Sequence, residues 1–357
     1  MISALLRVPV YKLFHRFGWP QLLPMNLTIS ACFRCNSRCR TCNVYEQVVK
    51  ELTPDEYDRI FASIGRSLTW LTISGGEPFL RKDIAEIAEA ACRRGRPSVV
   101  NIPTNGTFPD RVIEAVPRIA RAVAPGSLIL NVSLDGIGDE NDELRGLPGD
   151  WALARETFDR LKALRLRNLS VGIHSVISRH NVRRFPQIAD ELMALRPDQY
   201  IAEVAEERRE LLTVGAGITP DPDDFDAAVG HLSRRLREFR AHGIARLTRA
   251  IRLTYYDLAR ETLRRKTQVI PCYAAVASAQ IAAEGTVWGC CVKARPLGNL
   301  RETGYDFRAI WTGAAARDER RAIRAKECHC PLANAAYTSI LHDVGSLGRV
   351  AGHLLGR

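Results

Sequence analysis

At 357 residues, with 46% hydrophobic and 25% charged residues, the chain has the size and composition of a globular protein with one large domain and a small one. No run of 18 apolar residues occurs, which excludes a membrane-spanning helix. The formal net charge of +11, mostly from arginine, reflects either genome composition or an anionic partner such as a phosphorylated substrate, nucleic acid or a membrane surface.

Residues 1–24 form an N-terminal segment in which apolar residues are interleaved with Arg7, Lys12 and Arg16. The pattern is typical of an amphipathic segment at a membrane surface, but also of a helix packed on the domain. The basic residues lie inside the apolar stretch and no small-residue cleavage site follows, which argues against a signal peptide.

From residue 25 to about 205, short apolar strands alternate with helical patterns. Such alternation predicts parallel strands joined by right-handed crossovers, and hence an α/β fold with a partial (β/α)6 barrel of the TIM type. In such barrels the chemistry takes place at the carboxyl ends of the strands. The predicted strands are 25–31, 69–74, 98–103, 128–134, 169–177 and 199–204, and the helices between them are 53–65, 82–94, 108–123, 151–166 and 182–195.

The ten cysteines fall into tight groups, apart from Cys92, and no signal peptide precedes them. Such groups indicate metal ligation in a reducing compartment rather than a disulfide framework, which predicts a cytoplasmic protein. Cys32 and Cys92 are expected to be core thiols.

The loop after the first predicted strand carries Cys35, Cys39 and Cys42 at a C-x3-C-x2-C spacing. Three thiolates hold three irons of a 4Fe-4S cluster and leave the fourth iron open, unlike the four-cysteine ligation of an electron-transfer ferredoxin. An open iron can chelate a ligand through an amine and a carboxylate, as S-adenosylmethionine does. The unequal spacing disfavours a zinc site, which prefers paired cysteine knuckles, and buried free thiols are the other alternative.

Further motifs follow the later predicted strands. Each alone is an ordinary turn signal, but their convergence on one rim of the barrel predicts a functional site. They are Ser74-Gly75-Gly76-Glu77-Pro78, Thr104-Asn105-Gly106, Ser133-Leu134-Asp135-Gly136 with Arg145-Gly146, and His174 with Asn181.

Residues 206–267 are predicted to form a charged helical connection, whose arginines belong either to a solvated face or to a binding surface. A second module follows over 268–335, with a β-hairpin predicted at 281–292 and a helix near 314–326. Residues 336–357 form an apolar and basic tail. Within the module, Cys272 precedes the hairpin, Cys290 is placed on its second strand with Cys291 next in the chain, and Cys328 and Cys330 follow the helix.

With these motifs placed, the sequence resembles the radical S-adenosylmethionine (radical SAM) superfamily over about residues 25–335, and its C-terminal part resembles the SPASM/twitch subgroup. The resemblance implies that Cys35, Cys39 and Cys42 hold the reactive cluster. It also implies a set of residues around S-adenosylmethionine: Gly75, Gly76, Glu77, Pro78, Thr104, Asn105, Ser133, Asp135 and Arg145.

Among these residues, the two glycines would let the backbone approach the cofactor, and Glu77 would contact its methionyl ammonium. Ser133 and Arg145 match cofactor-contacting positions of sulfatase-maturing relatives, and Arg145 would suit the carboxylate. Asp135 would either reach the ribose or serve a local turn. The residue before the last cluster cysteine is often aromatic in the superfamily but is Thr41 here, which leaves the adenine to backbone groups or to Tyr45.

The resemblance also implies a fully ligated auxiliary 4Fe-4S cluster, as in twitch-type alcohol dehydrogenases. Its four ligands would be Cys272, Cys290, Cys328 and Cys330, too few for the two clusters of a full SPASM domain. A saturated cluster suits the acceptance or relay of an electron. Cys291 stands where sulfatase-maturing relatives have an aspartate proposed as a base. It is interpreted as an alternative cluster ligand, a buried structural thiol or a hydrogen-atom donor.

The implied reaction begins when a reductant such as flavodoxin or ferredoxin supplies an electron and S-adenosylmethionine is cleaved to a 5′-deoxyadenosyl radical. The radical would take hydrogen from an unactivated C–H bond in the barrel mouth. Transfer of an electron to the auxiliary cluster would complete a dehydrogenation. Donation of hydrogen by a thiol, with Cys291 as the candidate, would complete an epimerisation, and His174 is a second candidate catalytic residue.

The substrate is expected to be a sugar, a glycolipid or another small anionic molecule, with the protein peripheral to the inner membrane face. A ribosomally made peptide is the alternative, weakened because only about 24 residues precede the first strand where many peptide maturases have a leader-binding domain. A non-catalytic metal-binding protein is a third hypothesis, which the three-cysteine site disfavours. Nucleic acid is not an expected partner, because aromatic and basic residues are not interleaved.

Overall fold

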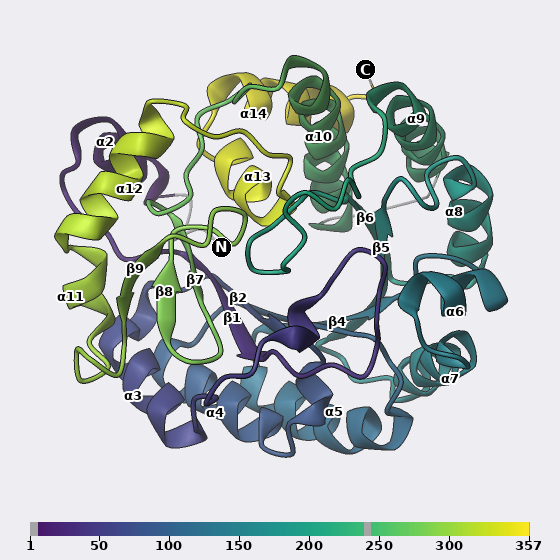
Figure 1. The fold of residues 1–357 in the computed structure, drawn as a ribbon, viewed down its shortest axis with the longest axis horizontal. Helices are drawn as coiled ribbons and strands as arrows, with labels where there is room; N and C mark the ends of the chain where they lie inside the picture. Colours follow the sequence, from purple (N-terminus) through teal and green to yellow (C-terminus); the bar gives the residue numbers. More distant parts are fainter. Residues whose placement is uncertain (1–5, 239–243, 357) are drawn as a thin grey trace.

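The computed structural model describes residues 6–238 and 244–356. Among them, nine strands form one sheet in the order β6-β5-β4-β3-β2-β1-β7-β8-β9 (Figure 1). The first six are parallel and confirm the predicted partial barrel within one or two residues at each end. They are β1 (Asn26–Cys32), β2 (Trp70–Gly75), β3 (Val99–Thr104), β4 (Ser127–Ser133), β5 (Leu169–Ile177) and β6 (Gln199–Val204).

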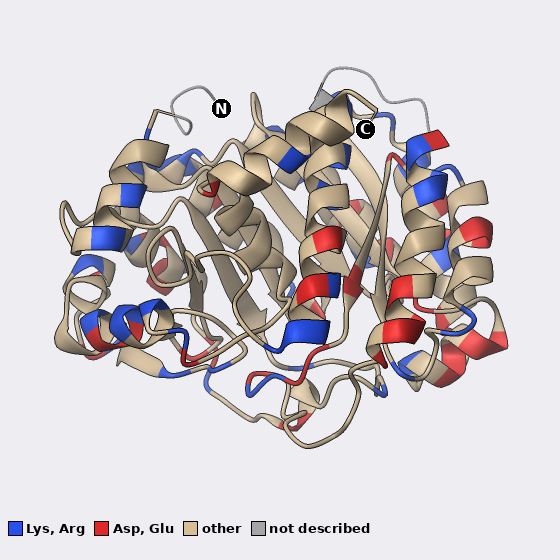
Figure 2. Ribbon diagram, turned by 90° about the horizontal axis from the view of Figure 1, so that it is seen from above, with Lys and Arg blue, Asp and Glu red and all other residues tan. Residues whose placement is uncertain are grey.

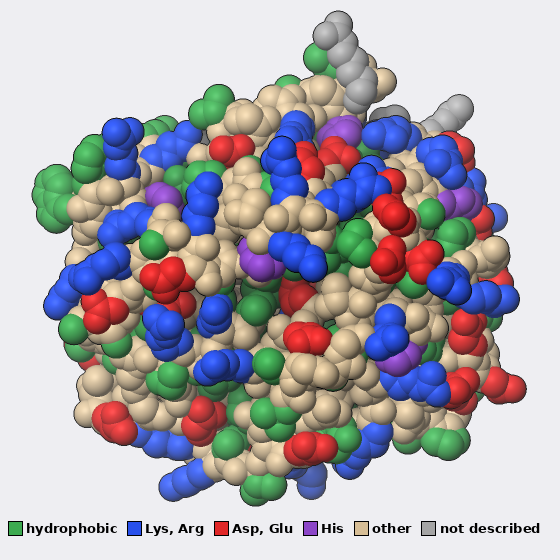
Figure 3. Space-filling model, turned by 45° about the horizontal axis from the view of Figure 1, so that its top comes forward, with side chains coloured by type: hydrophobic (Ala, Val, Ile, Leu, Met, Phe, Trp, Pro, Cys, Tyr) green, Lys and Arg blue, Asp and Glu red, His purple; other side chains and the backbone are tan. Residues whose placement is uncertain are grey.

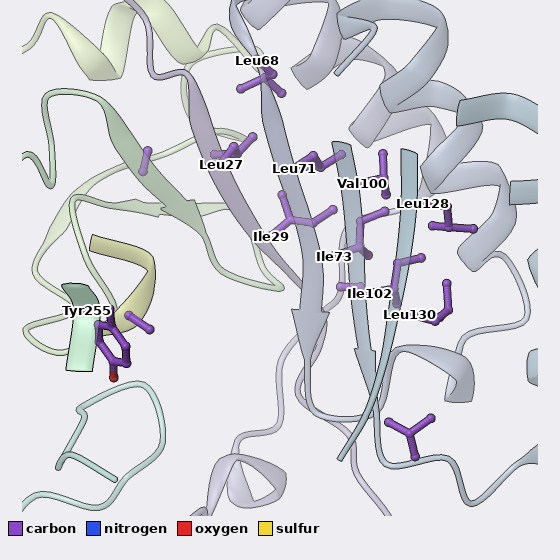
Figure 4. Close-up of a cluster of buried hydrophobic side chains, with 14 of the residues drawn as sticks. Leu27, Ile29, Leu68, Leu71, Ile73, Val100, Ile102, Leu128, Leu130 and Tyr255 are labelled. Carbon is purple, nitrogen blue, oxygen red and sulfur yellow. The ribbon is translucent and has the colours of Figure 1, made fainter. Parts of the chain in front are cut away.

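Apolar and polar residues alternate along these strands because successive side chains point to opposite faces of a sheet. Figure 4 shows one apolar row, in which Leu27, Ile29, Leu71 and Ile73 are fully buried against the outer helices. The intervening positions are polar, and Asn131 Nδ2 donates to Asn101 Oδ1 at 2.8 Å across the inner face. The interior of the barrel is therefore polar.

The predicted crossover helices are all present. A capping box starts the first of them: Glu56 N donates to Thr53 Oγ1 at 3.3 Å, and Thr53 N donates to Glu56 Oε2 at 2.8 Å. A short helix, α6, was not predicted. The helices are α3 (Pro54–Ile64), α4 (Ile84–Gly95), α5 (Pro109–Val123), α6 (Asp139–Arg145), α7 (Asp150–Ala163) and α8 (Phe185–Ala194), with 3-10 turns η1 (Val44–Glu46), η2 (Gly65–Ser67) and η3 (Pro78–Leu80).

The C-terminal module continues the barrel sheet. Its first strand, β7 (Ser278–Ile281), pairs in parallel with β1, and β8 (Thr286–Trp288) pairs antiparallel with β7 to form the predicted hairpin. The third strand, β9 (Pro296–Asn299), extends the sheet. Cys290 and Cys291 follow β8 in a turn, so the prediction that Cys290 lies on the second strand of the hairpin is wrong.

Helices from the connection and the tail close the open side of the barrel (Figure 1). After β6 the chain forms an irregular loop, and the helices of the connection begin only at Pro222. Asn334 and Thr338 of α13 are hydrogen-bonded to Thr28 and Asn26 of β1, both at 3.0 Å. These helices are α9 (Pro222–Glu238), α10 (Ile244–Arg265), α13 (Ala333–Ile340) and α14 (Val344–Leu354), while α11 (Phe307–Trp311) and α12 (Ala314–Arg324) belong to the C-terminal module and pack against its strand β9.

The N-terminal segment forms one helix, α2 (Val8–Phe17), and its first five residues lie outside the described residues. Tyr11 and Phe14 are buried, which confirms a helix packed on the domain, while its other face is exposed. Within residues 6–238 and 244–356, every helix is too short or too polar to cross a bilayer.

Candidate functional site

The three predicted cluster cysteines lie in the loop directly after β1, at the carboxyl end of the parallel sheet. Backbone N–H groups of Arg38 and Arg40 in this loop donate to the carbonyls of Arg145 and Leu144 at 2.9 and 3.0 Å. Gly146 comes equally close, because a Cβ there would lie 2.2 Å from the Arg38 carbonyl oxygen. The end of α6 therefore holds the cysteine loop in place.

The residues after β3 hold the same loop from another direction. Asn105 Nδ2 donates to Asn36 Oδ1 at 2.8 Å and to Ser37 Oγ at 3.0 Å. Asn36 Nδ2 donates to Thr107 Oγ1 at 2.9 Å. The amide of Asn105, a predicted cofactor contact, thus positions the cysteine loop. Asn36 and Ser37 were not predicted as site residues.

Burial raises the pKa of the Cys35 thiol, and it raises those of Cys39 and Cys42 to about 12 and about 11. For Cys39, Arg145 lowers the pKa in part while the neighbouring Cys42 and Cys35 raise it. Across the described residues, no three Cys, His, Asp or Glu side chains gather as they would around one metal ion. A 4Fe-4S cluster does not need its ligands to meet at one point, because each thiolate binds a different iron. Three neighbouring thiols that do not surround a single metal ion therefore fit such a cluster.

Gly75 and Gly76 make their closest approach to the backbone of residues 32–34. A Cβ on Gly75 would lie 2.1 Å from the Cys32 carbonyl oxygen, and a Cβ on Gly76 would lie 2.1 Å from that of Arg34. Gly75 also has a φ of +121°, which L side chains rarely adopt. The two glycines are therefore required where the turn after β2 contacts the start of the cysteine loop; their approach to the cofactor stays a prediction.

Glu77 is buried and its carboxylate accepts three hydrogen bonds. The donors are Phe79 N and Thr104 Oγ1, both at 2.9 Å, and Asn105 N at 2.7 Å. Burial raises the pKa of Glu77 to about 6, although these donors lower it in part. Glu77 thus joins the turn after β2 to the turn after β3, and Pro78 begins η3 directly after it. Its contact with the methionyl ammonium stays a prediction.

Arg145 and Asp135 form an ion pair at the ends of α6 and β4. Arg145 Nη1 lies 3.1 Å from Asp135 Oδ2, with side-chain exposures of 11% and 7%. Asp135 Oδ1 accepts from Val176 N at 2.7 Å, so both carboxylate oxygens have partners. Arg145 Nε is buried and has no partner within the described part of the chain. A guanidinium with an unused donor beside the cysteine loop fits a carboxylate ligand.

The four predicted auxiliary ligands also come together. Burial raises the pKa of Cys272 to about 12 and that of Cys290 to about 11, and the nearby Cys328 raises both further. Cys272, Cys290 and Cys330 pack against one buried group that contains Leu332 and Ala335. Cys272, Cys328 and Cys330 line a pocket between α10 and α13. This group of thiols beside a pocket fits a second cluster.

Cys291 belongs to a buried group with Leu332 and Ala335, against which Cys272, Cys290 and Cys330 also pack, and it also contacts the loop after β6. It is 4% exposed, and Arg208 Nη1 lies 3.9 Å from its Sγ. Arg208 pairs with Glu206 at 2.7 Å, and Glu210 accepts from Ser30 Oγ at 3.0 Å and from Gln280. Burial raises the pKa of Glu206 to about 7 and raises that of Glu210.

Glu206, Arg208 and Glu210 were missed in the sequence because residues 206–267 were interpreted as a helical connection. Their position directly after a predicted parallel strand was the signal that could have placed them on the rim. His174 lies on the same rim, 3.5 Å from Glu203. Burial favours a raised pKa for Glu203, but the adjacent His174 brings it below its ordinary value. Ser133 pairs with His174 in the sheet and is half-buried.

Residues 29–192 match the radical SAM superfamily, and residues 272–331 match an iron–sulfur cluster-binding domain, SPASM. The chain belongs to the radical SAM superfamily, in its SPASM/twitch subgroup. Proteins with these two domains bind S-adenosylmethionine, a 4Fe-4S cluster and auxiliary iron–sulfur clusters. The first region contains the cysteine loop and the second contains all four predicted auxiliary ligands.

Curated relatives of this radical SAM protein have several activities. Fe-coproporphyrin III synthase of Methanosarcina barkeri is 33% identical over 165 residues, 44% of this chain and only 38% of that protein. AdoMet-dependent heme synthase of the same organism is 26% identical over 314 residues, 83% of each chain. Mycofactocin maturase of Mycobacterium ulcerans is 28% identical over 212 residues, 56% of this chain and 54% of the relative.

Among solved structures, SuiB of Streptococcus suis bound to S-adenosylmethionine superposes with a TM-score of 0.62. The superposition covers 86% of this chain and 70% of SuiB at 15% identity. At this identity the likeness shows that the two chains share a fold.

Replacing Arg145 with methionine is expected to weaken S-adenosylmethionine binding at least about tenfold, because a charge-assisted hydrogen bond contributes roughly 1.5–3 kcal/mol. Iron content should be kept, since the cysteine loop is held by the backbone carbonyls of Leu144 and Arg145, which the substitution leaves in place. Equilibrium dialysis of the reconstituted enzyme measures the affinity. Arg40→Met, at an exposed arginine on the same loop, is the control. Unchanged affinity in Arg145→Met would contradict the assignment.

Asp150 gives a pH-dependent prediction. It is fully buried, Asn141 Nδ2 donates to its Oδ2 at 2.8 Å, and burial raises its pKa to about 6 from 3.8. A carboxyl group whose pKa is higher in the folded than in the unfolded protein stabilises the folded state below the unfolded pKa. This stability is lost as the pH rises through the folded pKa of about 6. Asp150→Asn cannot ionise, so from about pH 5 to about pH 8 its free energy of unfolding should fall by about 1 kcal/mol less than that of the wild type. Urea unfolding measures this, and equal pH slopes would contradict it.

Proposed function

We propose that the enzyme acts on a substrate bound between its two cysteine groups, at the carboxyl end of the barrel. The strongest support comes from the loop after β6, which is hydrogen-bonded both to the segment after Cys42 and to the segment after Cys291. Asn43 N donates to the Leu211 carbonyl at 2.9 Å, and Arg209 N donates to the Val292 carbonyl at 3.1 Å. This loop carries Glu206, Arg208 and Glu210, and its Arg208 contacts Cys291 and Glu206.

In the proposed reaction, the cluster and S-adenosylmethionine, when bound, supply the 5′-deoxyadenosyl radical that abstracts hydrogen. Cys35, Cys39 and Cys42 hold that cluster, and the unused Nε–H of Arg145 orients the S-adenosylmethionine carboxylate. Cys272, Cys290, Cys328 and Cys330 hold the auxiliary cluster. Flavodoxin or ferredoxin is the proposed reductant.

Cys291 is proposed to stay outside the auxiliary cluster and to donate a hydrogen atom to the substrate radical. One electron from the proposed reductant and one proton would then return the resulting thiyl radical to the thiol. The Cys291 Sγ contacts Arg208, and Arg208 is paired with Glu206. The thiol therefore lies beside charged side chains of the loop after β6. Such a thiol supports an epimerisation. A dehydrogenation is the second possibility, in which His174 and Glu203 would hold the departing proton.

The proposed substrate is a peptide. The carboxyl groups of Glu203, Glu206 and Glu210 make the mouth rich in hydrogen-bond acceptors, which suits a substrate with N–H donors. The mycofactocin maturase relative, though matched over 54% of its length, supports the peptide alternative over the sugar or glycolipid that the sequence placed first. A sugar is kept as the second candidate, because hydroxyl groups would also donate to these carboxylates.

The test is deuterium transfer into 5′-deoxyadenosine under anaerobic conditions with a reduced flavodoxin. A deuterated peptide encoded beside the gene should label 5′-deoxyadenosine, and a deuterated glycan should not. Transfer from the glycan, or from neither, would overturn the peptide proposal. The cytoplasm, at the inner face of the membrane, is the proposed location.

A further inference from the structure

The outward face of α2 is apolar along its whole length. Leu6, Pro9, Leu13 and Phe17 follow one another at three- or four-residue intervals and so share one face. Leu6, Leu13 and Phe17 are 73%, 47% and 66% exposed, and Trp19, just past the helix, is 75% exposed. Large apolar side chains gathered on one surface indicate an interaction site.

The opposite face of α2 fixes the helix to the body of the protein. Tyr11 and Phe14 pack with Met25 and Tyr273 in a buried cluster. Tyr11 Oη donates to the Leu23 carbonyl at 2.6 Å. The helix cannot turn its apolar face inward without breaking these contacts, so that face is presented to solvent by the fold itself.

Basic side chains surround this apolar face. Lys12 and Arg16 come from α2, and α12 packs beside it, with Arg324 Nη1 donating to the His15 carbonyl at 3.0 Å. The same helix adds exposed Arg317 and Arg321; Arg321 Nη2 lies 3.3 Å from the exposed Asp318 Oδ1, and Glu319 is buried. Figure 2 shows mainly Lys and Arg on the helices nearest the N label, and Figure 3 shows hydrophobic side chains at its left edge among basic ones.

We propose that the α2 face (Leu6, Leu13, Phe17 and Trp19 with Lys12 and Arg16) docks on an anionic lipid bilayer. Aromatic and aliphatic side chains would enter the interfacial region while the basic side chains contact acidic headgroups. A second copy of the chain fits less well, because a twofold contact would bring Lys12 and Arg16 against their own copies.

Docking on the α2 face sets the orientation of the enzyme. Residues 18–25 join α2 to the amino end of β1, whereas the cysteine loop follows the carboxyl end of β1. The barrel mouth is thus kept away from the bilayer and open to a substrate and a reductant from solution. This inference rests only on the location given under the proposed function and not on the reaction.

The test is co-sedimentation of the full-length reconstituted enzyme with vesicles of phosphatidylcholine alone or with about one third phosphatidylglycerol. Binding should need the anionic lipid and should fall at least about tenfold between about 0.1 M and about 0.5 M NaCl. Phe17→Ser/Trp19→Ser should lose at least about tenfold in binding. The matched control Val48→Ser/Val214→Ser removes two exposed apolar side chains elsewhere and should bind as the wild type does.

Equal binding to both vesicles, no binding, or full binding by Phe17→Ser/Trp19→Ser would overturn the docking proposal. A wild-type dimer that this variant disrupts, without vesicle binding, would overturn it in favour of a second copy. 5′-Deoxyadenosine release from the same preparation is measured without vesicles, so failure of docking is separable from failure of the proposed function.

Discussion

Cys35→Ala is expected to lose about four of about eight irons per chain and to reduce 5′-deoxyadenosine formation at least about a hundredfold. The three thiols of the cysteine loop have no spare neighbour to replace one of them, since Cys32 is turned toward the carbonyls of Arg34 and Glu77. Replacing even a residue that orients a metal ligand typically costs about 10–100-fold, so loss of the ligand itself should cost more. Iron analysis and chromatography of the products measure both effects.

Cys92→Ala is the matched control, because Cys92 is a partly buried thiol of α4 that packs against the hydrophobic core. It should keep its iron and its 5′-deoxyadenosine formation. If Cys35→Ala kept full iron and activity, or if Cys92→Ala lost them equally, the assignment of the reactive cluster to the loop after β1 would be wrong.

Cys290→Ala and Cys291→Ala are expected to separate two roles in adjacent residues. Cys290→Ala should lose about half of the iron and at least about a hundredfold in product formation, while 5′-deoxyadenosine still forms. Cys291→Ala should keep all of its iron, because Cys272, Cys290, Cys328 and Cys330 are proposed to supply all four ligands and the Cys291 Sγ lies 3.9 Å from Arg208 Nη1. Product formation by Cys291→Ala should also fall at least about a hundredfold. 5′-Deoxyadenosine should still be released, but no hydrogen should be returned to the substrate.

The iron content of the two variants decides the assignment. Iron loss in Cys291→Ala together with retention in Cys290→Ala would exchange their roles and would remove the proposed hydrogen-atom donor. Full product formation by Cys291→Ala would exclude the donor role and leave a structural thiol.

The parallel barrel could be predicted from the sequence because strand and helix periodicities are local. Leu27 and Ile29 alternate with polar residues, and Thr53 and Glu56 form a cap within one helical turn. The pairing of β7 with β1 could not be predicted in this way, because it joins residues about 250 positions apart through backbone groups that every residue type carries. For the same reason, α13 could not be placed inside the open barrel.

The sequence predicted which residues belong to the candidate site better than it predicted what those residues contact. Gly75 and Gly76 were placed at the correct turn, but their missing side chains accommodate the backbone of residues 32–34. Glu77 was placed on the correct rim, yet its carboxylate is bonded to Thr104 and Asn105. These contacts depend on how neighbouring turns meet in space, which residue spacing along one chain does not encode.

The most direct test of the account is 5′-deoxyadenosine release by the wild-type enzyme after anaerobic reconstitution with iron and sulfide. We expect about eight irons per chain and release that requires both S-adenosylmethionine and dithionite. Zinc in place of iron, or an iron-loaded protein that releases no 5′-deoxyadenosine, would contradict it.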